Sequence, residues 1–443
     1  MDRIIYSNLV KWKNSSRRKP LILKGVRQCG KTYILRKFGK ENYENVAYFN
    51  FEASSDLHNV FENELDPHRI LDLLRLKFNI RIDNQTLIIF DEIQFCNKAL
   101  TSLKYFFENA PEVHIACAGS LLGVMLSKPL SFPVGKVNFL TMYPLSFPEF
   151  LMAAGKSNWI QYLENLLPNE AVNESIAAPI MDLYKEYCFV GGMPEAVEKW
   201  ISDRDPKIIR DIQLEVISSF EMDFAKHAPL KDLQSINHVW NSIPQQLSKE
   251  NTKFVFGHVI KGARAKDLEN SLQWLIDAGL AYKVKMISKP SIPISAYADP
   301  SAFKLYLFDV GILSAMAKLN MRSILLEDPA YKEFKGSLTE NYVLNELIAS
   351  TGEVPFYWRS GNKAEVDFVH MFDDRIIPIE VKAGAYSRLQ SMERYMELFK
   401  PEKAFVISEK NVHLGNITSI PLILTWNMKK YVECLSETIV FDG

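Results

Sequence analysis

Residues 25–32 constrain the fold of this chain more than any other stretch. Their sequence, Gly-Val-Arg-Gln-Cys-Gly-Lys-Thr, fits the pattern G-x-x-x-x-G-K-[S/T]. In such a loop the glycines let backbone N–H groups turn inward around a polyphosphate, the lysine reaches the terminal phosphates, and the last hydroxyl takes a coordination place on Mg²⁺. The pattern predicts a phosphate-binding loop, with Thr32 also a metal ligand. Its cofactor-binding residues are Gly25, Val26, Arg27, Gln28, Cys29, Gly30, Lys31 and Thr32.

The segments on either side of this loop agree with the prediction. A phosphate-binding loop follows a strand and opens a helix. Residues 20–24, Pro-Leu-Ile-Leu-Lys, are typical of a short buried strand, and residues 33–38 are typical of the start of a helix. The alternative is a glycine-rich turn that binds nothing.

A second stretch supplies two carboxylates. Residues 86–92, Thr-Leu-Ile-Ile-Phe-Asp-Glu, form a short apolar run that ends in acidic residues. This is typical of a central parallel strand whose carboxyl end opens onto a nucleotide. We expect Asp91 to hold the Mg²⁺ shell through Thr32 or water, and Glu92 to polarise the attacking water. Hydrolysis needs both groups, because a carboxylate fixed on the metal cannot also accept the proton from water.

Ser120 is the third candidate in this part of the chain. Residues 112–118 predict another buried strand, which ends directly before Gly119 and Ser120. The hydroxyl of Ser120 would then lie where a sensor of the γ-phosphate is needed. The alternative is an ordinary helix cap, which is the commonest role of a serine after a strand.

Length and composition limit the class of protein. The 443 residues allow about three domains. The net charge of −1 means that any contact with nucleic acid must come from a local patch. The five scattered cysteines lack C-x-x-C spacing and indicate reduced thiols without a zinc site. No apolar stretch reaches the ~18 residues of a membrane span, so we expect a cytoplasmic protein with no membrane partner.

The chain as a whole predicts an α/β protein with four domains. Residues 1–155 alternate short apolar runs with helical stretches, which predicts a doubly wound P-loop domain. Residues 156–228 predict a helical lid or linker, interrupted by a turn at residues 191–194. Residues 229–300 predict a winged-helix-like domain, and residues 301–443 a C-terminal α/β domain.

The winged-helix prediction depends on helices over residues 236–247 and 266–277, followed by a glycine turn and a strand over residues 279–287. Between residues 253 and 289 there are seven Lys or Arg and three Asp or Glu, a net charge of +4. This is the best local case for contact with the phosphate backbone of DNA. The alternative is a helical packing module with a solvated charged face.

The last quarter of the chain contains another group of acidic residues. Glu340 lies on a predicted helix over residues 336–350, and Asp367 and Glu380 lie on predicted strands. These three carboxylates would bind Mg²⁺, and Lys382, on the same strand face as Glu380, would orient water or stabilise charge on a scissile phosphate. The alternative is a solvated Glu–Lys pair on an edge strand.

The order of these motifs resembles that of a known family. The family comprises bacterial and archaeal AAA+ superfamily ATPases in which an N-terminal P-loop ATPase core is joined to a C-terminal restriction-endonuclease-like domain. The resemblance spans nearly the whole chain. Its anchors are residues 25–32, 89–92, 118–120, 143–150, 191–195, 304–311, 340–341, 365–367 and 380–382.

The resemblance implies ATP and Mg²⁺ as cofactors, ATP hydrolysis, and a C-terminal fold of the PD-(D/E)-x-K type with carboxylates at Asp367 and Glu380. ATP rather than GTP comes from the resemblance alone, since the loop contacts only phosphates. One residue departs from the family, because Lys136 follows Gly135 where members usually have arginine. If that arginine acts across the subunit boundary of a homo-oligomer, Lys136 supplies charge without the bidentate fork.

Three functions remain open at this point. The first is an ATPase whose nucleotide state controls binding to nucleic acid, in particular DNA. The second is an ATP-dependent DNA nuclease that uses Asp367, Glu380 and Lys382. The third is a nucleotide-gated regulator that binds protein partners.

Overall fold

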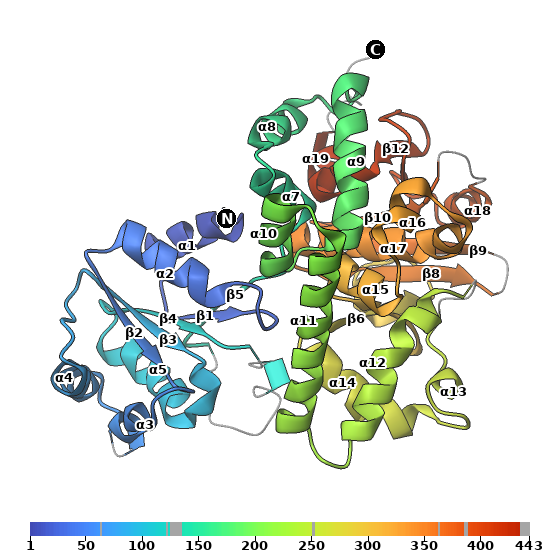
Figure 1. Ribbon diagram of the computed structural model, residues 1–443. Coiled ribbons are helices and arrows are strands. Elements are labelled where there is room, and N and C mark those ends of the chain that lie inside the picture. Colours follow the sequence, from blue (N-terminus) through green and yellow to red (C-terminus); the bar gives the residue numbers. More distant parts are fainter. Residues whose placement is uncertain are drawn as a thin grey trace. The chain divides into compact units, whose positions relative to one another are not determined.

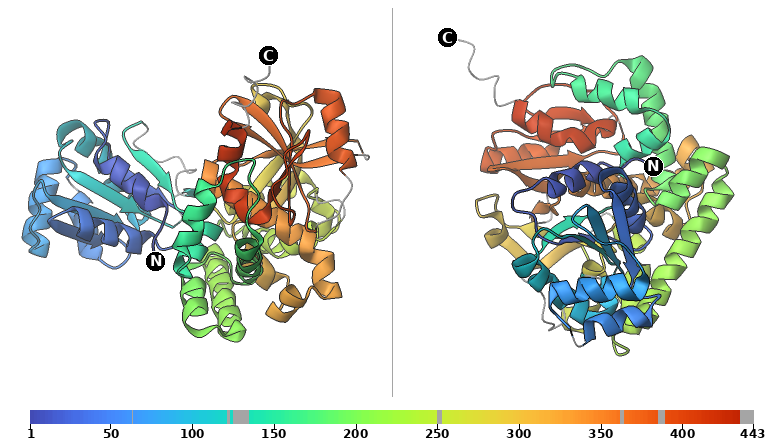
Figure 2. Two further views of the ribbon diagram at one scale, coloured as in Figure 1. Left: turned by 90° about the horizontal axis from the view of Figure 1, so that it is seen from above. Right: turned by 90° about the vertical axis from the view of Figure 1, so that its left-hand side faces the viewer.

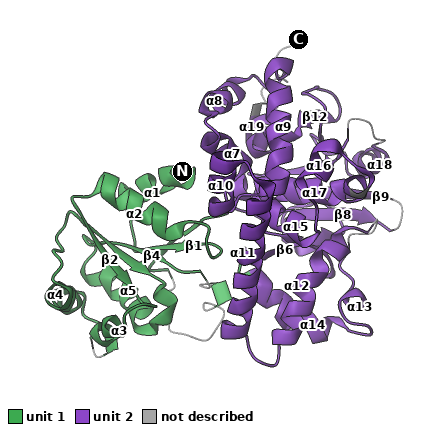
Figure 3. Cartoon of the chain, viewed as in Figure 1, with its two compact units in different colours: residues 1–143, 277–279 green, residues 144–276, 280–443 purple. Residues whose placement is uncertain are grey.

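The structure is a computed structural model of the chain (Figure 1). It describes residues 1–62, 64–120, 123–124, 135–249, 253–361, 364–384 and 389–434. The chain folds into two compact units (Figure 3). Unit 1 comprises residues 1–143 and 277–279, and unit 2 comprises residues 144–276 and 280–443. The four predicted domain ranges stay predictions.

Unit 1 is built on a five-stranded parallel sheet with the strand order β2-β3-β4-β1-β5. Its strands are β1 (Leu21–Lys24), β2 (Asn45–Asn50), β3 (Thr86–Asp91), β4 (His114–Ala118) and β5 (Asn138–Thr141). Its helices are α1 (Ile5–Lys13), α2 (Lys31–Asn42), α3 (Ser55–Glu62), α4 (Pro67–Phe78) and α5 (Asn97–Asn109), with a 3-10 turn η1 (Ile93–Phe95). The predicted α/β architecture of this part of the chain is confirmed.

Helices cover both faces of this sheet. Figures 1 and 2 show α1 and α2 on one face and α3, α4 and α5 on the other. Residues of β3 are buried along its whole length, as a strand covered on both faces requires. Because β3 and β1 both pair with β4 in parallel, the carboxyl ends of these three strands meet at one edge of the sheet. The phosphate-binding loop, Asp91 and Ser120 follow or end these strands.

Unit 2 contains a seven-stranded mixed sheet with the order β12-β11-β10-β9-β8-β6-β7. Its strands are β6 (Ala281–Ile287), β7 (Ala298–Leu307), β8 (Phe356–Ser360), β9 (Ala364–Phe372), β10 (Arg375–Val381), β11 (Phe405–Ser408) and β12 (Thr418–Pro421). β9 pairs with β10 in antiparallel orientation, so Asp367 and Glu380 lie on neighbouring strands.

The helices of unit 2 come before, between and after these strands. They are α7 (Phe147–Ala153), α8 (Ser157–Asn165), α9 (Glu174–Val190), α10 (Pro194–Asp203), α11 (Pro206–His227), α12 (Leu233–Leu247), α13 (Phe256–Val259), α14 (Ala265–Asp277), α15 (Val310–Met316), α16 (Met321–Leu326), α17 (Pro329–Thr351), α18 (Gln390–Phe399) and α19 (Met428–Cys434), with 3-10 turns η2 (Ile294–Tyr297) and η3 (Leu422–Asn427).

The predicted helices of the winged-helix segment are present as α12 and α14, and its strand as β6. However, β6 pairs with β7 and with β8, so it belongs to the same sheet as the C-terminal strands. The predicted boundary between residues 300 and 301 falls within β7. The segment therefore contributes a strand to the C-terminal sheet, and its assignment as a winged helix stays a prediction.

Asp309 gives a structural role to the turn at residues 191–194. Its carboxylate accepts a hydrogen bond from the Gly192 N–H (2.7 Å) and one from the Ile312 N–H at the start of α15 (2.9 Å). Burial raises the pKa of Asp309 to about 6. A Cβ atom on Gly192 would lie 2.0 Å from the Leu145 carbonyl oxygen, and one on Gly311 would lie 2.4 Å from the Val190 carbonyl oxygen. The glycines allow backbones to meet closely at this point.

Candidate functional sites

The loop after β1 has the backbone that its glycines predict. Gly25 has φ 151° and Gly30 has φ 95°, in the left-handed region where glycine is favoured. A Cβ atom on Gly25 would lie 2.2 Å from the Met142 carbonyl oxygen, so no larger residue fits there. Gln28 also has a positive φ, of 64°. Gly30 directly precedes α2, which places the loop at the N-terminal end of a helix, where backbone N–H groups are free to bind an anion.

Lys31 is the buried cation of this loop. The residue is 6% exposed, and its Nζ donates hydrogen bonds to the carbonyl oxygens of Gly25 (2.9 Å) and Val26 (2.7 Å). The ammonium is thus held against the loop backbone. If a polyphosphate were bound in the loop, the Lys31 ammonium could donate to phosphate oxygens in place of these two carbonyl oxygens. Charged acceptors form stronger hydrogen bonds than neutral ones.

Thr32 and Asp91 meet at the carboxyl ends of β1 and β3. The Thr32 hydroxyl donates to Asp91 Oδ2 at 2.9 Å, and the Tyr48 hydroxyl donates to the same oxygen at 2.6 Å. Asp91 is 3% exposed, so these contacts orient a nearly buried carboxylate. Burial, and after it the hydrogen bond to Asp91, raise the pKa of Tyr48. The guanidinium of Arg36 lies over the Tyr48 ring, 3.8 Å from its centroid.

Glu92 and Ser120 are also in contact. Ser120 donates to Glu92 Oε2 from its hydroxyl (3.2 Å) and from its backbone N–H (3.4 Å), and Gln94 Nε2 donates to the same oxygen. Glu92 itself has φ 50°, in the left-handed region, which is unusual for a residue other than glycine. Two of the predicted catalytic residues therefore lie within hydrogen-bonding distance, on loops that follow adjacent parallel strands.

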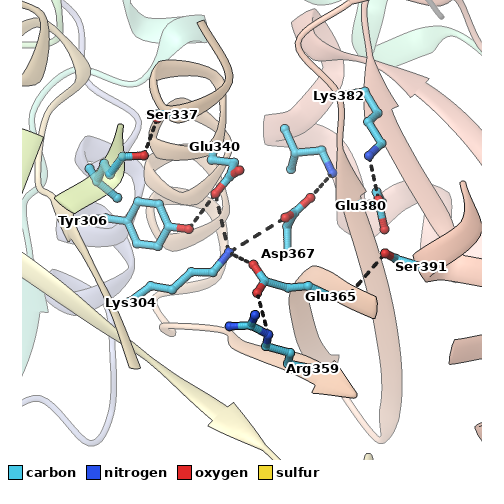
Figure 4. Close-up of polar contacts among 12 residues, drawn as sticks. Lys304, Tyr306, Ser337, Glu340, Arg359, Glu365, Asp367, Glu380, Lys382 and Ser391 are labelled. Carbon is cyan, nitrogen blue, oxygen red and sulfur yellow. Dashed lines mark hydrogen bonds and ion pairs between the residues drawn. The ribbon is translucent and has the colours of Figure 1, made fainter. Parts of the chain in front are cut away.

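The acidic residues of the last quarter form a second group, in unit 2 (Figure 4). Glu340 comes from α17, Glu365 and Asp367 from β9, and Glu380 from β10. Tyr306 on β7 donates to Glu340 Oε2 at 2.8 Å, and the Val381 N–H donates to Asp367 Oδ2 at 2.7 Å. We refer to Glu340, Glu365, Asp367 and Glu380 as the acidic cluster.

A lysine lies within the acidic cluster. The Nζ of Lys304, on β7, is 2.6 Å from Glu365 Oε1, 3.7 Å from Glu340 Oε2 and 3.9 Å from Asp367 Oδ1 (Figure 4). Its side chain is 1% exposed. Burial by itself lowers the pKa of Lys304, but attraction by the surrounding acidic groups outweighs it and raises the pKa well above its ordinary value. Burial, and after it Glu340, raise the pKa of Asp367.

Lys382 forms an ion pair with the last member of the cluster. Its Nζ is 2.7 Å from Glu380 Oε1, so the two side chains lie together as their spacing on the strand predicts. Glu380 is only 3% exposed, so the predicted alternative of a solvated Glu–Lys pair does not describe it. Burial raises the pKa of Glu380, and the neighbouring Lys382 opposes this rise.

The basic segment of residues 253–289 presents much of its charge to solvent. Five of its cations are exposed, on α14, on β6 and on the connections beside them: Lys261, Arg264, Lys266, Lys285 and Lys289. Lys283 is partly buried, and its Nζ lies 4.3 Å from the centroid of the Phe303 ring. The exposed cations are therefore available to an anionic partner.

Three family models match the chain. Residues 17–151 match a model described as an AAA domain. We refer to residues 17–151, which match this model and contain the phosphate-binding loop, as the AAA-like domain. Residues 181–323 and 335–424 match two further models, each described as a domain of unknown function (DUF8612 and DUF4143). These two matches leave the predicted restriction-endonuclease-like fold a prediction. No curated protein matches the chain.

Several solved structures are similar to the chain at low sequence identity. The Walker-type ATPase PABY2304 of Pyrococcus abyssi is 13% identical, with a TM-score of 0.45, over 71% of this chain and 95% of that one. The Orc1 protein of Aeropyrum pernix in complex with DNA is 12% identical (TM-score 0.30, 71% and 90%), and RuvB of Thermotoga maritima is 14% identical (TM-score 0.30, 63% and 87%).

The AAA-like domain fits a bound Mg²⁺ at one place. The Thr32 hydroxyl and the Asp91 carboxylate are oxygen ligands of the kind that Mg²⁺ prefers, and Mg²⁺ in nucleotide sites keeps several waters and phosphate oxygens besides one or two protein ligands. The described residues include no group of three or more His, Cys, Asp or Glu side chains that could hold a metal ion. The roles predicted for these residues stay predictions.

Lys136 also lies in the AAA-like domain, beside α5. Its Nζ is 3.0 Å from Glu108 Oε1 and 5.3 Å from the centroid of the Phe107 ring. The ammonium therefore has a partner in its own chain.

Among the described helices, none is long and apolar enough to cross a membrane.

Tyr48 and Lys304 are among the residues of these sites that were not predicted from sequence. Tyr48 lies in the middle of β2, and only the register of β2 against β3 brings its hydroxyl to Asp91. Lys304 belongs to a segment that the family resemblance includes, but no role was predicted for it. The sequence feature that could have identified Lys304 is that it is the single charged residue in the apolar run 302–308. A lysine buried in such a strand requires anionic partners.

Proposed function

We propose that the AAA-like domain binds ATP with Mg²⁺ and hydrolyses it. The observation that carries this proposal is the meeting of Thr32 and Asp91 at 2.9 Å, beside a lysine held in a glycine loop. A hydroxyl and a carboxylate joined at the mouth of a phosphate-binding loop are the pair needed to hold a metal against the terminal phosphates.

Each residue then has a distinct role. The loop N–H groups and Lys31 bind the phosphates, and Thr32 and Asp91 hold Mg²⁺, which when bound neutralises charge on the phosphate oxygens. Glu92 accepts the proton of the attacking water. Ser120 donates to Glu92 from two groups, and this contact supports a role for Ser120 in orienting the base or in sensing the γ-phosphate.

Two substitutions separate binding from hydrolysis. Lys31→Ala is expected to abolish ATP binding measured by calorimetry. Glu92→Gln is expected to leave binding intact and to reduce turnover roughly 10²-fold or more, the usual contribution of a general base. Lys37→Ala is a matched control, because Lys37 lies on the same helix and pairs with Asp2 at the surface. Unchanged ATP affinity in Lys31→Ala would overturn the proposal.

We also propose that the exposed cations of residues 253–289 contact nucleic acid, so that nucleotide state controls DNA binding. The support is their exposure and the local charge of +4 in a chain whose net charge is −1. A partner protein with an acidic surface would be bound by the same charges, and a direct measurement of duplex DNA binding distinguishes the two.

A further inference from the structure

The contacts of the acidic cluster in unit 2 indicate a role for it that does not depend on the proposed ATPase. Metal-binding carboxylates converge on one point, which a divalent cation occupies. In this cluster the point shared by Glu340, Glu365 and Asp367 is the Nζ of Lys304, which is within 4 Å of an oxygen of each (Figure 4).

The strand pattern explains why the ammonium lies there. Side chains alternate along β7, so Lys304 and Tyr306 share one face of the strand. Tyr306 donates to Glu340, and Lys304 extends toward β9 (Figure 4). Lys304 is 1% exposed, and a buried ammonium is tolerated only when it is paired. The cluster therefore accounts for the burial of Lys304.

Two further basic side chains of the chain lie against the cluster. Glu380 pairs with Lys382 at 2.7 Å, and the Nε of Arg359 lies 3.8 Å from Glu365 Oε2. Four carboxyl groups thus face three basic side chains. A divalent cation placed among Glu340, Asp367 and Glu380 would add two positive charges beside the Lys304 ammonium, which is itself 1% exposed, and like charges repel strongly where little water screens them. The residues do not fit a resident metal ion.

We propose that Lys304 is the built-in counter-ion of the acidic cluster and takes the place of a divalent metal. The cluster then joins α17, β7 and β9 through ion pairs and does not cut nucleic acid by a metal-dependent route. The predicted nuclease chemistry of Asp367, Glu380 and Lys382 is thereby replaced by a structural role.

The test uses Mn²⁺ alone as the probe, on the full-length chain without nucleotide. The wild type is expected to melt at the same temperature in EDTA and in Mn²⁺. Lys304→Ala opens the site and leaves its carboxylates unpaired, so this variant is expected to melt lower in EDTA and to be raised by Mn²⁺. In Lys304→Ala/Asp367→Asn the effect of Mn²⁺ is expected to vanish, which assigns the metal to this cluster rather than to the phosphate-binding loop.

Two outcomes of the Mn²⁺-binding experiments would overturn the proposal. One is a failure of Mn²⁺ to stabilise Lys304→Ala, since Lys304 would then not occupy a metal position. The other is binding of Mn²⁺ by the wild type that is lost in Asp367→Asn, measured by the paramagnetic resonance of free Mn²⁺. This second measurement needs no Lys304 variant, so it decides the question even if Lys304→Ala does not fold. Plasmid cleavage with Mn²⁺ that depends on Asp367 would also overturn it.

Discussion

At the scale of single residues, the unexpected member of the nucleotide site is Tyr48. Its hydroxyl donates to Asp91 Oδ2 at 2.6 Å, the oxygen that also accepts from Thr32. Groups that orient a metal ligand affect metal affinity nearly as much as the ligands do, because they fix the position and basicity of the ligand. Tyr48 is such a positioning residue if Asp91 holds Mg²⁺.

The first prediction is that Tyr48→Phe weakens the Mg²⁺ dependence of ATP binding. We expect the affinity of the ATP complex for Mg²⁺ to fall on the order of 10-fold, because Asp91 loses one of its two side-chain donors. Thr32→Val, which removes a direct ligand at constant shape, should cause a larger loss. Calorimetric titration of ATP over a series of Mg²⁺ concentrations measures both.

Tyr105→Phe is the control for that experiment, since Tyr105 lies on α5 and makes no contact with Asp91 among those described. ATP binding without Mg²⁺ should be nearly unchanged in Tyr48→Phe. An equal loss with and without Mg²⁺ would instead mean that Tyr48 maintains the fold of the loop.

A second prediction concerns pH and the buried Glu346 of α17. Its Oε1 accepts the Phe147 N–H at the start of α7 (2.7 Å), and its side chain is 1% exposed. Burial raises the pKa of Glu346 from an ordinary 4.5 to about 8. Between these values the folded state keeps a proton that the unfolded state has lost. The free energy of unfolding therefore falls as pH rises through this range, by at most about 1.4 kcal/mol per pH unit.

Glu346→Gln isolates this effect, because the amide oxygen can still accept the Phe147 N–H while the side chain no longer titrates. We expect urea unfolding between pH 5 and about 8 to show a flatter pH profile in this variant than in the wild type. Parallel profiles for the two proteins would show that Glu346 ionises at its ordinary pKa in the folded chain.

At the scale of elements, we predict opposite effects on stability for Gly→Ala substitutions at Gly192 and at Gly336. Only Gly192 lies where two backbone segments approach closely. A Cβ atom on Gly192 meets the Leu145 carbonyl oxygen at 2.0 Å, whereas one on Gly336, within α17, meets nothing within 4 Å. We expect Gly192→Ala to destabilise unit 2 by several kcal/mol or to prevent folding. Gly336→Ala should stabilise it by roughly 0.5–1 kcal/mol, the helix preference of alanine over glycine. Chemical denaturation of both variants, with the sign of each change, is the measurement.

The positions of helices and strands could be predicted from the sequence, but the pairing of distant strands could not. Strands such as β1 and β3 and helices such as α12 and α14 follow from local periodicity, and their predicted positions hold within a few residues. The pairing of β6 with β8 cannot be predicted from local periodicity, because nothing in residues 281–287 specifies a partner strand about seventy residues later in the chain. The same limit applies to Lys304. Its burial was readable from the apolar run around it, but its partners come from a helix and a strand that only the tertiary fold brings together.

At the scale of the whole molecule, the net charge is −1, so long-range attraction to DNA is absent and any binding must depend on the local charge of residues 253–289. Counterions released on binding make the affinity for DNA depend on salt. The slope of the logarithm of the binding constant against the logarithm of the salt concentration is about −0.9 for each phosphate neutralised in duplex DNA, so the slope measures the number of phosphate contacts. The last prediction is that duplex DNA binding by this chain shows a negative slope of this kind.

Charge-neutral variants locate the contacts. We expect Lys261→Gln, Arg264→Gln and Lys266→Gln, taken singly, to weaken binding and each to reduce the slope by about one. Lys199→Gln is the matched control, because Lys199 is also an exposed lysine, and it lies on α10, where it pairs with Asp203 outside this segment. Fluorescence anisotropy with labelled duplex over a salt series, with and without ATP, gives slope and nucleotide dependence together. Two results would contradict DNA binding by the basic segment: a slope near zero, or a slope that Lys199→Gln changes as much as Lys261→Gln does. An acidic protein would then be the expected partner of the segment.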